Sequence, residues 1–236
     1  MTHESRFARW AGFTYLVVVV TGFFSLGYVP GKVAAPGNPQ AMLANIVAHE
    51  GLFRAGIASF MVEQVAFLLL PLLLFRLLVR VNRVAAVTMV ALALTAVPIA
   101  LVGVAHRLDA LWLLTGAALP VETANAMARL SLSSYAHAIF VANLFWGLWL
   151  LPFGYLVFNS RMLPRVLGIL LIVGGFGYLV DVFADLLLPL VVDTTFSRYV
   201  HLPAALGEVG TCLWLLVMGV RAREEHEPAH LARSAA

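Results

Sequence analysis

Six long apolar stretches dominate the pattern of hydrophobic and polar positions along this chain. Each is long enough to cross about 30 Å of hydrocarbon, which takes roughly 17–25 helical residues. None shows the alternation of a membrane β-strand, so we predict helices. The pattern indicates an all-α integral membrane bundle of six transmembrane helices, with residues 11–220 as one membrane domain. The predicted spans lie near Ala11–Tyr28, Ala55–Phe75, Val84–Val104, Tyr135–Phe158, Val166–Val192 and Leu202–Val220.

Two of the loops between these spans carry shorter helical patterns. In residues 30–50, Asn38 is a suitable N-cap, Pro39 suits the first helical position, and apolar residues follow at helical spacing. We therefore predict a short interfacial helix in this outer loop. Val121–Leu132 repeats the arrangement more weakly and predicts a second one. The polar ends, residues 1–10 and 221–236, are expected to be tails, the C-terminal one disordered.

Composition supports a membrane protein. Hydrophobic residues make up 62% of the 236 residues and charged residues 11%, whereas soluble proteins contain about 25% charged residues. The single cysteine, Cys212, excludes an internal disulfide bond. The net charge of +3 is small, so the placement of the basic residues is more informative than their number.

The arginines predict how the bundle is oriented. With six spans, ten of the 15 basic residues fall on one side of the membrane. By the positive-inside rule that side is cytoplasmic, which places both termini in the cytoplasm. The ten residues are Arg6, Arg9, Arg76, Arg80, Arg83, Arg161, Arg165, Arg221, Arg223 and Arg233.

Acidic residues and histidines gather in the opposite, outer half. Asp181 and Asp185 interrupt the fifth span four residues apart, so they share one helix face. A carboxylate at membrane depth costs at least about 2.5–3.5 kcal/mol and normally faces a partner or a cavity. We take the outer half as a candidate ligand or ion pocket. Its candidate residues are Asp181, Asp185, Glu208, Glu63, His106, Asp109, His201, Glu50 and Arg54.

Three functions fit such a pocket, and the residues leave all three open. The leading interpretation is recognition of a small or lipid-like ligand. A second is a metal-assisted hydrolase of a lipid-like substrate, in which a divalent metal held by imidazole and carboxylate groups activates water. The third is a proton- or cation-coupled carrier. The metal-ligand candidates are His106, Asp181, Asp185 and His201.

Several observations weigh against chemistry at these residues. The histidines form no compact metal motif, so interfacial side chains bonded to water or backbone explain them more simply. The spans show no inverted repeat of the kind found in many carriers. Structural ion pairs are a further alternative: Arg54 with Glu50, and Arg107 with Asp109 or Asp185. The expected partner is the lipid bilayer, with no nucleic acid.

Three short motifs resemble a known family. They are Arg9-x-x-Gly12-x-x-Tyr15-Leu16, Ala48-His49-Glu50-x-x-Phe53-Arg54 and Ser160-Arg161-x-Leu163-Pro164-Arg165-x-Leu167-Gly168. Together they are similar to the bacterial membrane family catalogued as domain of unknown function 4386, over roughly residues 6–220. The resemblance implies a six-span protein of the bacterial inner membrane and carries over no catalytic residue. Asp181 and Asp185 are not part of the family pattern.

The orientation can be tested by cysteine labelling. We expect Lys32, Glu122 and Asp193 on the outer side, because the arginines occupy the other side. A Lys32→Cys or Glu122→Cys protein should therefore react with an impermeant thiol reagent added outside the cell. Labelling only after the inner membrane is opened would contradict the predicted orientation.

Overall fold

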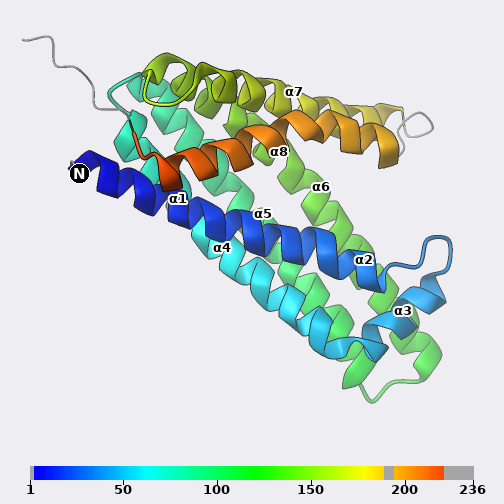
Figure 1. The fold of residues 1–236 in the computed structure, drawn as a ribbon. Coiled ribbons are helices and arrows are strands. Elements are labelled where there is room, and N and C mark those ends of the chain that lie inside the picture. Colours follow the sequence, from blue (N-terminus) through cyan, green and yellow to red (C-terminus); the bar gives the residue numbers. More distant parts are fainter. Residues whose placement is uncertain (1–2, 189–193, 221–236) are drawn as a thin grey trace, which may run out of the picture.

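The structure is a computed structural model that describes residues 3–188 and 194–220 (Figure 1). Within these residues, six helices are long and apolar enough to cross a membrane. They confirm the predicted all-α fold with six candidate membrane spans. These spans are Glu4–Val33, Glu50–Leu78, Arg83–Thr115, Val121–Ser160, Arg165–Leu187 and Tyr199–Val217. Asp193 and the predicted C-terminal tail lie outside the described residues.

The first span is one continuous helix built from three segments. The α-helix α1 (His3–Gly22) passes into a π-helical segment, η1 (Phe23–Tyr28), and then into α2 (Val29–Val33). After a short loop comes α3 (Pro39–Ala48). The remaining helices are α4 (Glu50–Leu78), α5 (Arg83–Thr115), α6 (Val121–Ser160), α7 (Arg165–Leu187) and α8 (Thr194–Val217).

Of the two predicted interfacial helices, one forms as a separate element. In α3, the Oδ1 atom of Asn38 accepts a hydrogen bond from the backbone N–H of Ala41 at 3.0 Å, which confirms the predicted N-cap. Val121–Leu132 is instead the beginning of the 40-residue α6, so the prediction of a second short helix is wrong. The helix continues because no glycine or proline interrupts this segment, and Ala128 packs in a cluster with Leu43 of α3.

The six spans are arranged so that each packs on the next, and α8 returns to pack on α1. Figure 1 shows the start of α1 at one end of the bundle and α2 and α3 at the other. We call these the N-terminal end and the α3 end. At the N-terminal end, Arg76 of α4 lies 4.4 Å from the ring centroid of Phe7. Arg9 donates a hydrogen bond to the Val217 carbonyl of α8 at 3.2 Å. Helix ends that are far apart in the sequence thus meet at this arginine-bearing end.

The main apolar core contains aromatic residues of α4 and α6. The rings of Trp149 and Phe153 stack at 5.1 Å, and Phe67 of α4 meets Trp149 edge-on at 5.2 Å. All three side chains are buried. These aromatic residues therefore pack the bundle and do not line an open ligand cavity.

Glycines allow α7 to approach its neighbours closely. A Cβ atom at Gly174 would collide with the backbone of Ala204 in α8, and one at Gly177 would collide with the Val200 carbonyl oxygen. On the side facing α6, a Cβ atom at Gly168 would lie 2.7 Å from the carbonyl oxygen of Gly154. Small residues permit such backbone contact in lipid, where dispersion drives helix association.

Replacing Gly174 tests this packing. Gly174→Ala should lower the free energy of unfolding in detergent by about 1–3 kcal/mol, because the added methyl group overpacks the α7–α8 contact. Gly51→Ala is the matched control. A Cβ atom there meets nothing within 4 Å, so that variant should keep its stability or gain up to about 1 kcal/mol from helix propensity. Equal effects at the two positions would contradict the packing argument.

Candidate functional site

The outer part of the candidate site lies where α7 meets α8. The Ser197 hydroxyl donates a hydrogen bond to Asp181 Oδ1 at 2.6 Å, and His201 Nε2 lies 3.3 Å from the other carboxylate oxygen. The His201 ring also stacks on the Tyr178 ring, with centroids 4.2 Å apart. Asp181 is therefore held by two polar partners and is only partly exposed. The pairing of Asp181 with His201 places two predicted site residues together.

Two further carboxyl groups lie deeper in the bundle. The Tyr15 hydroxyl of α1 donates a hydrogen bond to Glu208 Oε1 of α8 at 3.1 Å. On α4, Gln64 Nε2 donates to a carboxyl oxygen of Glu63. Glu63 is only 5% exposed and Gln64 is completely buried. Within the described part of the chain, Gln64 Oε1 has no hydrogen-bond partner.

Tyr178 connects the outer and deeper groups. Its side chain is within electrostatic range of Glu208, Asp181 and Glu63, and Glu63 and Glu208 also interact with each other. Along α8, Glu208 lies seven residues from His201, which is roughly 10 Å at about 1.5 Å per residue. The polar groups thus extend over about 10 Å of depth. We call them the interior polar cluster: Tyr15, Glu63, Gln64, Tyr178, Asp181, Ser197, His201 and Glu208.

The carboxyl groups of the interior polar cluster have neutral or imidazole partners. Among the side chains that the structure describes, neither Lys nor Arg forms an ion pair with Glu63 or Glu208. A buried carboxyl group without a cation is costly to maintain. Ion pairing with a described arginine therefore does not explain why Glu63 and Glu208 are inside the bundle.

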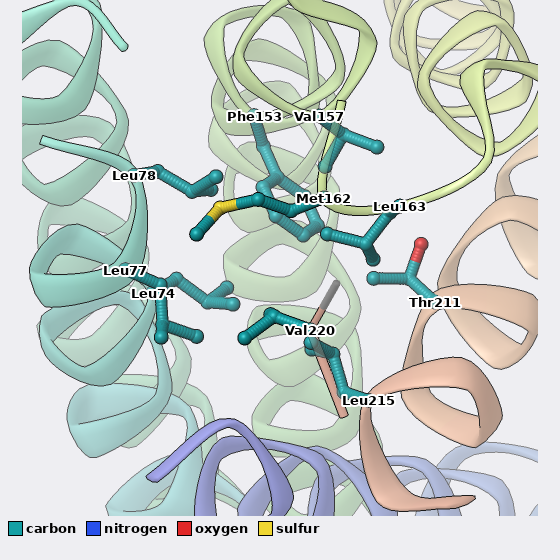
Figure 2. A pocket seen from close by; sticks show the side chains of 10 residues that line it. All are labelled: Leu74, Leu77, Leu78, Phe153, Val157, Met162, Leu163, Thr211, Leu215 and Val220. Atoms are coloured by element: carbon teal, nitrogen blue, oxygen red, sulfur yellow. The ribbon is translucent and has the colours of Figure 1, made fainter. Parts of the chain in front are cut away.

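An apolar layer separates the interior polar cluster from the N-terminal end. Figure 2 shows a small cavity there, surrounded by leucine and valine side chains and by Phe153 and Met162. Its volume is about 10 Å³, room for one water molecule at most. Thr211, one turn of α8 from Glu208, supplies a hydroxyl oxygen that lacks a hydrogen-bond partner among the described residues. These apolar side chains lie between the carboxyl groups and the N-terminal end of the bundle.

The structure brings together four of the nine predicted site residues: Asp181, His201, Glu208 and Glu63. Asp185, one turn further along α7, is exposed. His106 Nδ1 pairs with Asp109 Oδ2 on α5 at 3.8 Å. On α4, Arg54 Nε lies 2.7 Å from Glu50 Oε1, with the Arg54 side chain exposed and the Glu50 side chain partly exposed. These five residues lie outside the interior polar cluster. The role of all nine in ligand or ion binding stays a prediction.

The four metal-ligand candidates do not form one group. Asp181 pairs with His201, whereas His106 pairs with Asp109 on another helix. Among the described residues, no group of three or more His, Cys, Asp or Glu side chains is arranged to hold a metal ion. A divalent metal site therefore receives no support from this geometry.

Among the described residues, Arg107 makes cation–π contacts with two aromatic rings and not an ion pair with an aspartate. Its side chain, 3% exposed, lies between the ring of Phe53 on α4 and that of Tyr135 on α6, at 4.8 and 4.7 Å from the two centroids. No ion pair with Asp109 or Asp185 is present in the described structure. Two cation–π contacts of about 2 kcal/mol each when desolvated join three spans at the α3 end.

Sequence reasoning missed the neutral members of the site. In the sequence, Tyr15, Tyr178 and Ser197 look like ordinary residues of a span or loop. Their place in the site follows only from their contacts with Glu208, His201 and Asp181 in the folded bundle. The π-helical segment η1 was also missed. It begins just after Gly22, where an added Cβ atom would lie 3.6 Å from Glu63 Cγ. π-Helical turns occur often at functional sites, so the position of η1 beside Glu63 is consistent with a functional role for the interior polar cluster.

A family model described as Domain of unknown function (DUF4386) matches residues 10–219. The chain belongs to the DUF4386 family. This confirms the resemblance drawn from the three motifs and establishes a membrane protein without assigning a reaction. No curated protein and no solved structure matches the chain. Any function of this DUF4386 bundle must therefore be argued from its own residues.

The Asp181→Asn variant tests whether the Asp181 carboxylate stabilises the fold or serves ligand or ion binding. Asparagine keeps an oxygen that can accept the Ser197 hydrogen bond, and it removes a charge that is costly inside this DUF4386 bundle. The thermal midpoint in detergent should match or exceed that of the parent. Asp185→Asn, at an exposed position on the same helix, is the matched control. An Asp181→Asn protein that aggregates or melts far below the parent would instead mark a structural ion pair, which is worth about 3–5 kcal/mol when buried.

Proposed function

We propose that this membrane protein binds a small or lipid-like ligand with a positively charged or hydrogen-bond-donating head group at the interior polar cluster. The observation that carries the proposal is the pair of interior carboxyl groups, Glu63 and Glu208. They come from different helices, lie close enough for their charges to influence each other, and have a glutamine and a tyrosine as hydrogen-bond partners. A cationic head group would supply the charge that these carboxyl groups lack.

The partial exposure of the outer members of the cluster favours a binding site entered from the α3 end over a through-pore. Asp181 and His201 lie toward that end and are partly exposed, whereas an apolar layer closes the opposite side of the cluster. We propose that the α3 end faces outward and that the termini are in the cytoplasm of a bacterial cell. The support is the convergence of Arg9 and Arg76 at the N-terminal end, as the positive-inside rule requires.

A proton- or cation-coupled carrier is the second candidate. One observation favours it: Asp181, His201, Tyr178 and Glu208 follow one another from the outer part of the bundle toward its middle. Such a series of ionisable groups is typical of intramembrane proton paths. A carrier would also have to open the layer around Leu74 and Phe153. The third candidate, the metal-assisted hydrolase, has no comparable observation in its favour.

Three amphiphiles with the same twelve-carbon chain test the proposed ligand class. Dodecylamine, dodecanol and dodecanoate differ only in head group, so each can be added to the purified protein and the thermal midpoint measured. Dodecylamine should raise the midpoint most, because its ammonium group can pair with Glu63 and Glu208 in a dry environment. The neutral alcohol should have a smaller effect and the carboxylate the smallest.

Matched variants locate the effect. Glu63→Gln and Glu208→Gln should each abolish the preference for the amine, while Glu50→Gln, which removes a solvent-exposed acid paired with Arg54, should keep it. Equal stabilisation by the three amphiphiles in the parent protein would contradict the proposal. So would a preference for the amine that survives in both interior variants.

A further inference from the structure

The outer surface of the α1–α4 pair carries an open apolar groove with a volume of about 420 Å³. Phe13 and Val17 line it from α1, and Val62, Val65 and Leu69 from α4. Val65 is 62% exposed. Since both helices are membrane spans, this groove faces the hydrocarbon and not water.

A second hollow continues the groove toward the N-terminal end. It has a volume of about 320 Å³ and is lined by Arg6, Arg9, Trp10 and Phe13. Phe13 therefore lines both spaces. The rings of Trp10 and Phe13 meet edge-on with centroids 6.1 Å apart, and Trp10 is 63% exposed. An exposed tryptophan beside arginine is typical of the level of lipid head groups.

The length of the combined surface corresponds to one leaflet. Arg6 and Val17 are eleven residues apart on one helix, which is roughly 16 Å at about 1.5 Å per residue. Half of a hydrocarbon core of about 30 Å is roughly 15 Å. The two guanidinium groups thus lie at one end of a strip that is long enough for a single acyl chain.

We infer that this strip is a binding site for one anionic phospholipid, with its phosphate at Arg6 and Arg9 and an acyl chain in the α1–α4 groove. Charge complementarity selects this occupant over a second copy of the chain. A two-fold dimer about the membrane normal would bring the arginines of both copies together at the same depth, where like charges repel. Arg9 is positioned by its hydrogen bond to the Val217 carbonyl, so the site also depends on the α1–α8 contact. The inference is independent of the interior polar cluster.

Native mass spectrometry of the purified protein tests the site. Phosphatidylglycerol and phosphatidylcholine with identical acyl chains are titrated in detergent, and the retained lipid is counted. The parent should retain one phosphatidylglycerol in preference to phosphatidylcholine. Arg6→Gln should weaken this binding about fivefold, and the double variant Arg6→Gln, Arg9→Gln roughly 25-fold, as expected for basic residues near an anionic lipid. Val65→Trp should abolish retention by filling the groove.

Two controls keep general effects apart from the site. Arg83→Gln removes an exposed arginine at the same end of the bundle but on α5, and Val102→Trp adds the same bulk at an exposed position of α5. Both should retain phosphatidylglycerol like the parent. Arg9 also contacts α8, so the double variant could fail to fold. In that case the single variant Arg6→Gln, at an exposed position, is the test. The inference is overturned if the parent retains both lipids equally, if Arg6→Gln and Arg83→Gln behave alike, or if Val65→Trp retains the lipid.

Discussion

A carboxyl group inside a membrane needs a polar partner, and hydrocarbon supplies none. In this bundle the requirement links four spans: Tyr15 on α1 contacts Glu208 on α8, Gln64 contacts Glu63 on α4, and Tyr178 on α7 lies within electrostatic range of both acids. Each interior acid costs at least about 2.5–3.5 kcal/mol on insertion scales. Such a cost is hard to attribute to folding, because the partners are neutral. The ligand proposed above would complete the cluster when bound.

Close backbone packing positions these polar groups. Gly177 allows the chain of α8 around Val200 to lie against α7, and the neighbouring His201 ring stacks on Tyr178. On the other face of α7, a Cβ atom at Gly147 of α6 would lie 2.6 Å from Tyr178 Cβ. Tyr178 is thus held between two helices that glycine brings near. Glycines without functional side chains therefore determine where the polar side chains of the cluster meet.

The sequence predicted the membrane fold well because span length and arginine placement are properties of single segments. The N-cap at Asn38 was predictable for the same reason, since it depends on neighbouring residues. Which candidate residues lie together was predicted only in part, because convergence depends on how the helices rotate against one another. The i, i+4 spacing places Asp181 and Asp185 on one helix face, yet only Asp181 contacts His201. An ion pair with an acid was one alternative for Arg107, which instead lies between two aromatic rings, a contact that no local pattern shows.

The central claim is that the interior acids are reached from the α3 end. The most direct measurement is thiol labelling of Glu208→Cys, in a background where Cys212 is replaced by alanine, with a small charged reagent applied separately to each side of sealed vesicles. We expect labelling from the α3 side and none from the N-terminal side, because the apolar layer near Thr211 closes that path. Labelling from the N-terminal side, or from neither side, would contradict the account.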